Sequence, residues 1–355
     1  MAKVRLGMVG CGGISHAHGI GVRENPGRAQ FVACCDVHED RAKEWAAEYG
    51  CTTTYTDYNE MFAKEDLDGV VLATWPNQHR QQIEDALKGG QTNILCEKSL
   101  TVTGQEAVEV FDLVTKAGAY LMEGFMYRHH PAMRKMKELI DAGSIGPVDA
   151  VRACFSEFDG EEEDADDPNR NWRRDPARAG GIPYDFSCYC VNCCRFLADG
   201  VPTRIRTYGG MSDKYKTINR VYSMLEYDNG VVGYIEGSKH AAFKQDVEVT
   251  GRKAVLTLPV GWTILHEQNI TRRFAVGWAN LRQDNFFTPN DNAFVHQTAN
   301  FLDVIEGKAA PRIPLAESVI NCYTIEAKVT SLVEDREVTI DIPDHVVKSL
   351  KEATK

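Results

Sequence analysis

The first fifteen residues impose the strongest constraint on how this chain can fold. An apolar run, Val4–Val9, leads directly into Gly10-Cys11-Gly12-Gly13-Ile14-Ser15, which has the spacing G-x-G-x-x-[GAS]. This order is typical of a strand that ends in a tight glycine turn and is followed by a helix. The glycines would let the backbone approach a pyrophosphate, which would bind the free N–H groups at the positive end of the helix. An ordinary strand, turn and helix would give the same spacing, so this run alone does not decide.

The next apolar run supplies the second half of the signal. Residues 31–35 read Phe-Val-Ala-Cys-Cys, and the run ends at Asp36. A Rossmann unit places at about this point the carboxylate that binds the hydroxyls of the adenine ribose. Since a carboxylate there would repel a 2′-phosphate, the sequence predicts NAD rather than NADP as the cofactor. The residues expected to contact it here are Gly10, Cys11, Gly12, Gly13, Ile14, Ser15 and Asp36.

Beyond these two strands, apolar runs alternate with helical patterns as far as residue 122. The predicted strands cover residues 52–55, 69–73, 93–96 and 120–122, and the predicted helices cover residues 39–49, 59–63, 80–88 and 104–116. Such alternation predicts an α/β fold, a doubly wound parallel sheet with helices on both faces. Ligands of these sheets bind beyond the carboxyl ends of the strands. Further cofactor contacts are therefore expected from Thr74, Trp75, Asn77, His79, Glu97 and Lys98.

The pattern changes after residue 126. The predicted strands cover residues 148–158, 204–210, 221–227, 231–239, 246–250, 254–258 and 338–340, and the predicted helices cover residues 131–142, 292–305 and 316–332. Few helices separate these strands, which predicts an α+β domain with a large open, mostly antiparallel sheet. We expect a Rossmann domain over residues 1–125 and a substrate-binding and oligomerisation domain over 126–355. The C-terminal helix is expected to pack back on the Rossmann domain.

Composition narrows the class of protein. A chain of 355 residues is longer than one core usually supports, which fits two domains. A net charge of -11 without a basic stripe argues against nucleic acid as a partner. No apolar run is long enough to span a bilayer and no signal peptide precedes Val4, so we expect a cytoplasmic location. Eleven irregularly spaced cysteines fit reduced, buried thiols.

A cluster of four cysteines invites a metal-site interpretation. Cys188, Cys190, Cys193 and Cys194 would be scattered around the axis of a single helix. No second C-x-x-C motif or paired histidine set accompanies them. The sequence therefore predicts no metal site.

Four stretches together resemble the glucose-fructose oxidoreductase, inositol dehydrogenase and MocA family. They are the Gly10 loop, Cys96-Glu97-Lys98-Ser99-Leu100, Glu123–Pro131, and Gly180-Gly181-Ile182-Pro183-Tyr184-Asp185 followed by Tyr189. The resemblance implies a Rossmann domain joined to an open-sheet substrate domain that often builds homodimers or homotetramers. The chain departs from the family at Ser99, where a proline is usual, and at Trp75 in the loop after the fourth strand. Tyr189 places it with the branch that resembles dihydrodiol and xylose dehydrogenases.

The resemblance also implies a set of catalytic residues, Lys98, Asp185 and Tyr189. Asp185 and Tyr189 are four residues apart at the start of an apparent helix, so both could point at one substrate. Activating a tyrosine of ordinary pKa near 10 for neutral pH costs roughly 3–4 kcal/mol. A lysine ammonium within ~4 Å supplies about that much at an effective dielectric near 20. Either Lys98 or Tyr189 could take the proton, and a helix cap at Asp185 with a core tyrosine is the plain alternative.

Oxidation of a secondary hydroxyl of a sugar, polyol or glycoside is the activity that these residues favour. The expected substrate-binding residues are Lys98, Tyr127, Trp172, Arg173, Asp185, Tyr189 and His296. Two alternatives stay open. One is an enzyme that keeps NAD bound and oxidises a sugar transiently to allow elimination or glycosidic cleavage. The other is a sugar and dinucleotide sensor without catalysis, although a sensor needs no proton acceptor.

Overall fold

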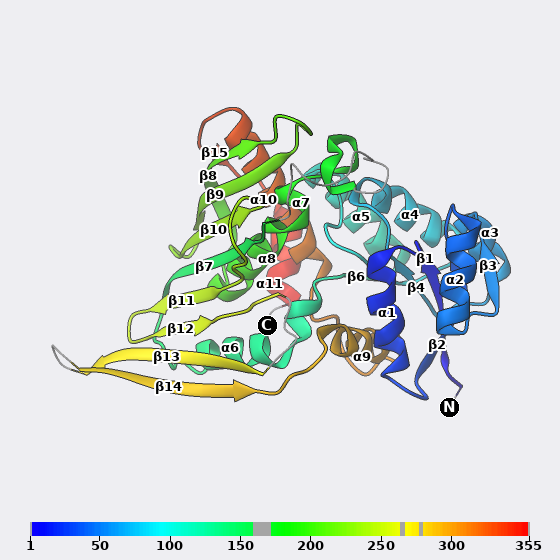
Figure 1. The fold of residues 1–355 in the computed structure, drawn as a ribbon, viewed down its shortest axis with the longest axis horizontal. Helices are drawn as coiled ribbons and strands as arrows, with labels where there is room; N and C mark the ends of the chain where they lie inside the picture. Colours follow the sequence, from blue (N-terminus) through cyan, green and yellow to red (C-terminus); the bar gives the residue numbers. More distant parts are fainter. Residues whose placement is uncertain (1, 159–171, 263–266, 277–279, 354–355) are drawn as a thin grey trace. The chain divides into compact units, whose positions relative to one another are not determined.

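The computed structural model describes residues 2–158, 172–262, 267–276 and 280–353 (Figure 1). The chain divides into two compact units. The first contains Met1–His129 and Asn292–Val319, and the second contains His130–Asp291 and Ile320–Glu352. A segment from late in the sequence therefore completes the first unit.

The first unit is built on a six-stranded parallel sheet with the order β3-β2-β1-β4-β5-β6. Its strands are β1 Val4–Val9, β2 Ala29–Cys35, β3 Thr53–Tyr55, β4 Gly69–Leu72, β5 Asn93–Cys96 and β6 Tyr120–Glu123. Its helices are α1 Gly13–Arg23, α2 Glu39–Tyr49, α3 Tyr58–Lys64, α4 Pro76–Lys88, α5 Gly104–Ala117, the 3-10 turn η1 Met126–His129 and α9 Ala293–Ile305. This is the doubly wound Rossmann arrangement that the sequence predicted.

Local signals in the sequence set the ends of these helices. Thr103 and Glu106 form a reciprocal capping box at the start of α5, so two backbone donors of its first turn are satisfied. Gly50 ends α2 in the left-handed conformation that glycine adopts without a steric penalty. The core beneath joins Phe31 and Trp45, whose rings meet edge to face 5.0 Å apart, with Phe301 of α9. Helix α9 thus belongs to this core despite its distance in sequence.

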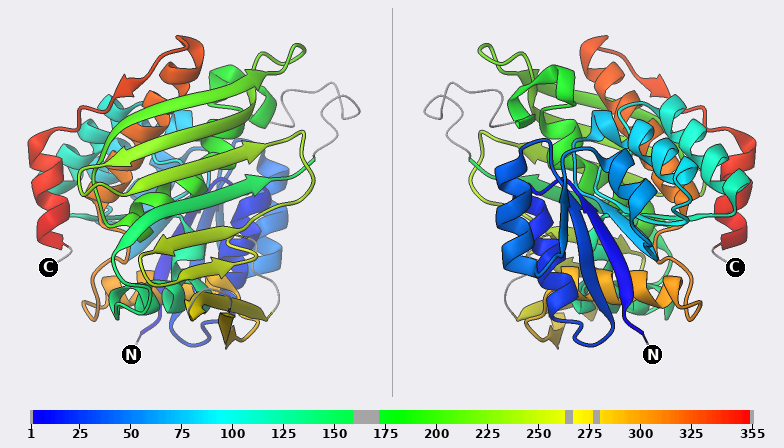
Figure 2. Two further views of the ribbon diagram at one scale, coloured as in Figure 1. Left: turned by 90° about the vertical axis from the view of Figure 1, so that its left-hand side faces the viewer. Right: turned by 90° about the vertical axis from the view of Figure 1, so that its right-hand side faces the viewer.

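The second unit contains a nine-stranded sheet with the order β14-β13-β12-β11-β7-β10-β9-β8-β15. Its strands are β7 Val148–Ser156, β8 Pro202–Met211, β9 Ile218–Tyr227, β10 Val232–Ser238, β11 Val247–Gly251, β12 Val255–Leu258, β13 Gln268–Val276, β14 Asn280–Thr288 and β15 Val338–Thr339. Only β7 and β10 pair in parallel among these neighbours, so the predicted open, mostly antiparallel sheet is confirmed. Figure 2 shows the breadth of this sheet in its left view.

Helices cover one face of this sheet. The helical segments of the second unit are α6 Pro131–Asp141, η2 Trp172–Arg174, η3 Pro176–Arg178, α7 Ile182–Asp185, α8 Ser187–Ala198 and α11 Asp344–Ala353, together with most of α10 Leu315–Val333. Helix α8 packs directly on β7 and β10. The opposite face of β8, β9 and β10 presents exposed side chains, among them Tyr208, Tyr222 and Met224.

The structure differs from the sequence predictions at four places. The strands β13 and β14 and the helix α11 were not predicted. Helix α4 begins at Pro76, four residues before the predicted start, because proline fits the first helical position. The helix predicted around Asp185 is broken at Phe186 into α7 and α8.

Two other predictions concern the membrane and the cysteines. Among the described residues, no helix is long and apolar enough to cross a bilayer. All the cysteines are free thiols, and all but the half-buried Cys51 are buried. The prediction of reduced, mostly buried thiols is therefore confirmed.

Candidate active site

The glycine turn joins β1 to α1 in the first unit. Gly10 has φ +89°, and a Cβ atom there would lie 2.8 Å from the carbonyl oxygen of Ala73, so only glycine fits. At Gly12 and Gly13 an added Cβ would have no described atom within 4 Å. The two glycines that open α1 therefore face free space, as a loop that binds pyrophosphate requires.

The rest of the loop is held against the second strand. Ser15 is buried and its hydroxyl donates to the carbonyl of Gly12 at 2.5 Å, whereas Ile14 is exposed. Asp36, which is 8% exposed, accepts hydrogen bonds from the backbone N–H groups of Cys11 and His38, both at 2.9 Å. The carboxylate predicted to bind the ribose thus lies beside the glycine turn and is oriented by its backbone.

Arg41 lies at the edge of the same site. Its guanidinium is 4.0 Å from the Asp36 carboxylate, and its side chain is 53% exposed. No role for Arg41 was predicted from the sequence. The position of this cation beside Asp36 bears on the choice between NAD and NADP.

The loop after β4 carries three of the predicted cofactor contacts. Thr74 is half-buried and donates its hydroxyl to the side-chain carbonyl of Gln82 at 2.5 Å. Trp75 is the half-buried N-cap residue of α4, and Asn77 is exposed in its first turn. All three lie at the carboxyl edge of the parallel sheet, where ligands of this fold bind.

Lys98 follows β5 at the same edge of the sheet and is half-buried. His79 of α4, which is completely buried, directs Nδ1 to the carbonyl oxygens of Ser99 at 3.0 Å and Leu100 at 3.2 Å. Burial lowers the pKa of His79, so the neutral ring donates one proton from Nδ1. His79 therefore fixes the backbone that follows Lys98. The peptide bond between Lys98 and Ser99 is cis.

Two buried carboxyl groups complete the support of this turn. Glu97 accepts from Nε2 of His18 at 2.9 Å and from the backbone N–H of Lys98 at 3.2 Å. Glu123 accepts from the N–H of Leu100 at 2.8 Å, and complete burial raises its pKa to about 8. Glu97 was predicted as a cofactor contact, and the structure places its carboxylate beneath the turn. The roles of His18 and Glu123 were not predicted.

The second unit brings three predicted substrate residues together. The guanidinium of Arg173 donates from Nε to the carboxylate of Asp185 at 2.7 Å. It also lies 5.1 Å from the ring of Trp172. Asp185 is 2% exposed, whereas the Arg173 side chain is 46% exposed. The Arg173 side chain therefore contacts both Asp185 and Trp172, and nearly half of it stays exposed.

Tyr189 lies in the first turn of α8 within a group of aromatic rings. Its ring is 5.6 Å from that of Phe155 and 5.8 Å from that of Trp262. Phe155 in turn stacks on Phe186 with the centroids 4.2 Å apart. Phe155, Phe186 and Trp262 come from segments that are separate in the sequence, so no local pattern indicated that they would surround Tyr189. The break at Phe186 means that Asp185 ends α7, whereas Tyr189 lies in the first turn of α8.

Two other predicted substrate residues belong to the first unit. Tyr127 in η1 is completely buried and meets Phe125 edge to face at 6.2 Å, which places it in the core. His296 is half-buried in the first turn of α9. Next to Tyr127, Arg128 forms a buried ion pair with Glu317.

Cys188, Cys190 and Cys194 of α8 hydrogen-bond to backbone carbonyl groups. The thiol of Cys188 donates to the carbonyl of Tyr184 at 3.2 Å, and that of Cys190 donates to the carbonyl of Glu236 at 3.7 Å. Burial raises the pKa of Cys194 to about 12, so this thiol keeps its proton. Within the described ranges, no three histidine, cysteine or acidic residues are arranged to hold a metal ion.

A buried lysine of α10, for which the sequence predicted no role, contacts the first residue of α8. Lys328 of α10 is completely buried, and Nζ is 2.6 Å from the hydroxyl oxygen of Ser187. Burial lowers the pKa of this lysine to about 8. Because a lysine is rarely fully buried, the sequence of α10 did not indicate the burial of Lys328.

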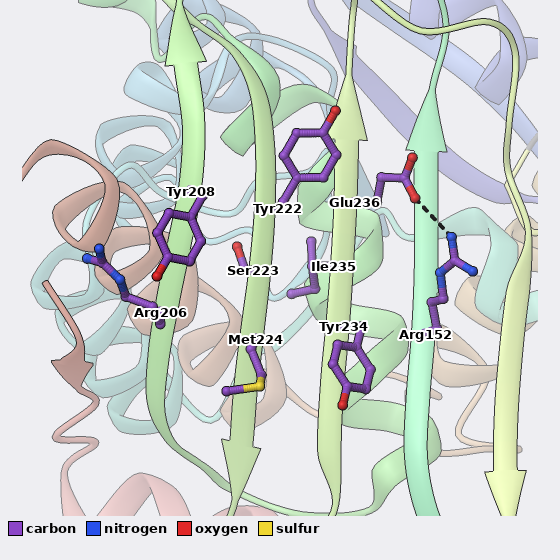
Figure 3. A pocket seen from close by; sticks show the side chains of 9 residues that line it. All are labelled: Arg152, Arg206, Tyr208, Tyr222, Ser223, Met224, Tyr234, Ile235 and Glu236. Carbon is purple, nitrogen blue, oxygen red and sulfur yellow. Dashed lines mark hydrogen bonds and ion pairs between the residues drawn. The ribbon is translucent and has the colours of Figure 1, made fainter. Parts of the chain in front are cut away.

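The exposed face of the large sheet has a hollow of about 390 Å³ (Figure 3). Side chains from β7, β8, β9 and β10 line it: Arg152, Arg206, Tyr208, Tyr222, Ser223, Met224, Tyr234, Ile235 and Glu236. The guanidinium of Arg206 lies 4.6 Å from the ring of Tyr208, and Arg152 pairs with Glu236 at 3.1 Å. Aromatic and methionine side chains with charged groups around them are typical of protein interfaces.

Comparison with known proteins agrees with both units. Residues 4–125 match an oxidoreductase family with an NAD-binding Rossmann fold, and residues 133–257 match the GFO/IDH/MocA C-terminal domain. A D-xylose 1-dehydrogenase (NADP(+)) of Haloferax volcanii is 30% identical over 322 residues, 89% of this chain and 95% of that protein. A scyllo-inositol 2-dehydrogenase (NAD(+)) of Bacillus subtilis is 24% identical and covers 96% of this chain and 97% of its own length.

Solved structures share the fold. A levoglucosan dehydrogenase in complex with NADH has a TM-score of 0.85 and 19% sequence identity, covering 96% of this chain and 100% of its own. At this low identity, the structural likeness supports the architecture alone. The matches in both domains and the relative of 30% identity show that the chain belongs to the Gfo/Idh/MocA oxidoreductase family and has its NAD(P)-binding Rossmann fold.

Proposed function

We propose that the protein is an NAD-dependent dehydrogenase that acts on a secondary hydroxyl of a sugar, polyol or glycoside. The observation that carries the proposal is the buried Asp185, which is bonded to Arg173 and lies just before Tyr189. A carboxylate, a guanidinium and a phenol in one short segment suit the recognition of a polyhydroxylated substrate. The xylose and inositol dehydrogenases among the relatives support this substrate class.

The residues of the first unit fit a dinucleotide. Gly12 and Gly13 leave space for the pyrophosphate at the start of α1, and Asp36 is oriented toward the same loop. When bound, NAD would accept the hydride from the carbon of the substrate. The loops after β4 and β5 would hold the nicotinamide end, with Thr74, Trp75 and Lys98 as the expected contacts.

Asp36 supports NAD as the cofactor, although the Haloferax relative is named for NADP(+). A 2′-phosphate next to this carboxylate would place like charges a few ångströms apart, which is unfavourable. Arg41 is the nearby cation that could bind a 2′-phosphate. We therefore propose that Asp36 sets the preference and that Arg41 becomes available to NADP only when Asp36 is replaced.

The side chains of the protein would remove one proton from the substrate. As the C–H bond of the alcohol gives up its hydride, the O–H proton passes to Tyr189 or Lys98, and a ketone forms. Asp185 and Arg173 would bind a neighbouring hydroxyl and fix the orientation of the ring. The His79 and Glu123 contacts would hold the Lys98 turn in place during this step.

Product analysis with a substrate panel tests this proposal. Pyranoses, inositols, anhydrosugars and glycosides would be incubated with the purified protein and NAD, and NADH and ketone would be measured. The proposal predicts equal amounts of NADH and ketone for at least one substrate. Turnover of a glycoside without net NADH would instead support transient oxidation by retained NAD. Tight binding of sugar and NAD without turnover of any compound would support a sensor.

We also propose that the exposed face of β8, β9 and β10 joins copies of the chain into a homodimer or homotetramer. Tyr222, Met224 and Tyr234 are each 45% exposed there, which is unusual for a group of large apolar side chains. Tyr222→Lys would place a charge in the centre of this patch. Light scattering after gel filtration should then show a smaller particle than the parent, whereas an unchanged mass would reject this face as the interface.

A further inference from the structure

The buried Lys328 is the start of a chain of hydrogen bonds within the second unit. Its Nζ donates to Oγ of Ser187 at 2.6 Å, and that hydroxyl donates to the carbonyl oxygen of Ile182 at 3.1 Å. All three residues are completely buried. Burying an ammonium group is costly unless its protons are bonded, so a lysine here calls for a specific reason.

The chain of hydrogen bonds ends at the break between α7 and α8. Ile182 is the first residue of α7 and Ser187 is the first residue of α8, so Lys328 connects the starts of both helices to α10. At a helix junction side chains can add to or replace the regular partners of the backbone groups. The carbonyl of Ile182 accepts the N–H of Phe186 at 3.2 Å and the Ser187 hydroxyl as well, and the thiol of Cys188 donates to the carbonyl of Tyr184.

The other side of the junction is fixed by the sheet. Gly181 precedes α7 with φ +105°, and a Cβ there would lie 2.9 Å from the carbonyl oxygen of Ile218 on β9. The backbone just before α7 therefore packs closely against β9. From the side of α10, the junction is contacted by Lys328 through Ser187.

We propose that Lys328 is a positioning residue for Asp185 and Tyr189, which acts through the hydroxyl of Ser187 to fix the break between α7 and α8. Asp185 is the last residue of α7, and Tyr189 is in the first turn of α8. A shift of the break would move both side chains relative to each other. The inference rests on the proposed function, in which these two residues bind and deprotonate the substrate.

Amide hydrogen exchange tests the positioning role without relying on activity. Lys328→Met removes the donor, and Ser187→Ala removes the link to Ile182. Each should increase exchange in peptides that cover residues 182–189 by about tenfold. Ser331→Ala is the matched control, since Ser331 is also buried on α10 but bonds the N–H of Thr207 at 2.9 Å.

Unchanged exchange at residues 182–189 in both variants would overturn the proposal. The proposal would also be overturned if Ser331→Ala increased exchange at residues 182–189 as much as Lys328→Met does, because the effect would then be a general loss of stability. If Lys328→Met fails to fold, Ser187→Ala and the hydroxyl-retaining Ser187→Thr decide the matter. Ser187→Thr should stay close to the parent, and equal exchange in both Ser187 variants would also contradict the role of the hydroxyl.

Kinetics on an active substrate provide the second readout. Lys328→Met and Ser187→Ala should each lower kcat about tenfold while leaving NADH binding unchanged, because a small misplacement of reacting groups costs rate. The double variant should lose no more than the worse single variant, since both act on one link. If the parent is active and the variants have the same kcat, the positioning role of Lys328 is refuted but the proposed function is not. If the parent is inactive, the proposed function is refuted, and the hydrogen-exchange experiment alone tests the role of Lys328.

Discussion

Replacement of Lys328 by methionine should change how the stability of the protein depends on pH. The pKa of a lysine is ordinarily 10.5, and complete burial lowers that of Lys328 to about 8. Between these two pH values the folded protein binds one proton fewer at this site than the unfolded chain. The free energy of unfolding that this group contributes therefore rises with pH in that window and is lowest below pH 8.

The expected size of the effect follows from the two pKa values. Their difference is about 2.5, and each pKa unit corresponds to about 1.4 kcal/mol, which gives roughly 3 kcal/mol. Methionine has no proton to release, so the variant lacks this dependence. The difference in unfolding free energy, parent minus variant, should therefore increase by about 3 kcal/mol between pH 7 and pH 10.5.

Urea denaturation followed by circular dichroism, in the presence of a reductant for the free thiols, measures this difference at each pH. Lys351→Met is the matched control, because Lys351 is an exposed lysine on α11. Its difference from the parent should stay constant with pH. If the difference in unfolding free energy for Lys328→Met is also constant with pH, then burial does not lower the pKa of Lys328, and the prediction is refuted.

Four further substitutions test the two halves of the site. Gly12→Ala should fold like the parent but bind NAD about tenfold more weakly in a fluorescence titration, whereas Gly10→Ala should lower stability by roughly 1–3 kcal/mol because of its positive φ. Equal stability of the two variants would contradict this assignment. Asp36→Ala should narrow the preference for NAD over NADP, and tighter binding of NADP by the parent would reject the role of Asp36. Arg173→Ala should raise KM for the sugar about tenfold with unchanged NAD affinity, and an unaltered KM would make it a surface residue.

The sequence predicted the fold well wherever periodicity and turn residues agreed. The alternation that follows Gly10 gave the parallel sheet, and the run of short strands gave the open sheet of the second unit. The hairpin of β13 and β14 was missed because β14 is mostly exposed and polar, so it lacks an apolar alternation. Helix α11 was missed although it is amphipathic; it is short, and its buried residues are Val346 and Leu350.

The candidate site was predictable by residue type but not by contact. The motif around Asp185 and Arg173 indicated polar substrate residues, and the structure joins them by an ion pair. Nothing in the sequence indicated that His79 would turn inward to hold the backbone after Lys98, since its burial depends on packing between elements distant in sequence. Lys328 was missed for the same reason.

The proposed function predicts that Lys98 and Tyr189 act together on one proton. A double-mutant cycle with Lys98→Met, Tyr189→Phe and the combined variant tests it, with the rate of NADH formation measured across pH on a substrate from the panel. If the ammonium activates the phenol, Lys98→Met should lower kcat and move the pH dependence of the rate upward. Tyr189→Phe should then add little in that background. Losses that simply add as free energies, with no change in the pH profile from either residue, would contradict the account.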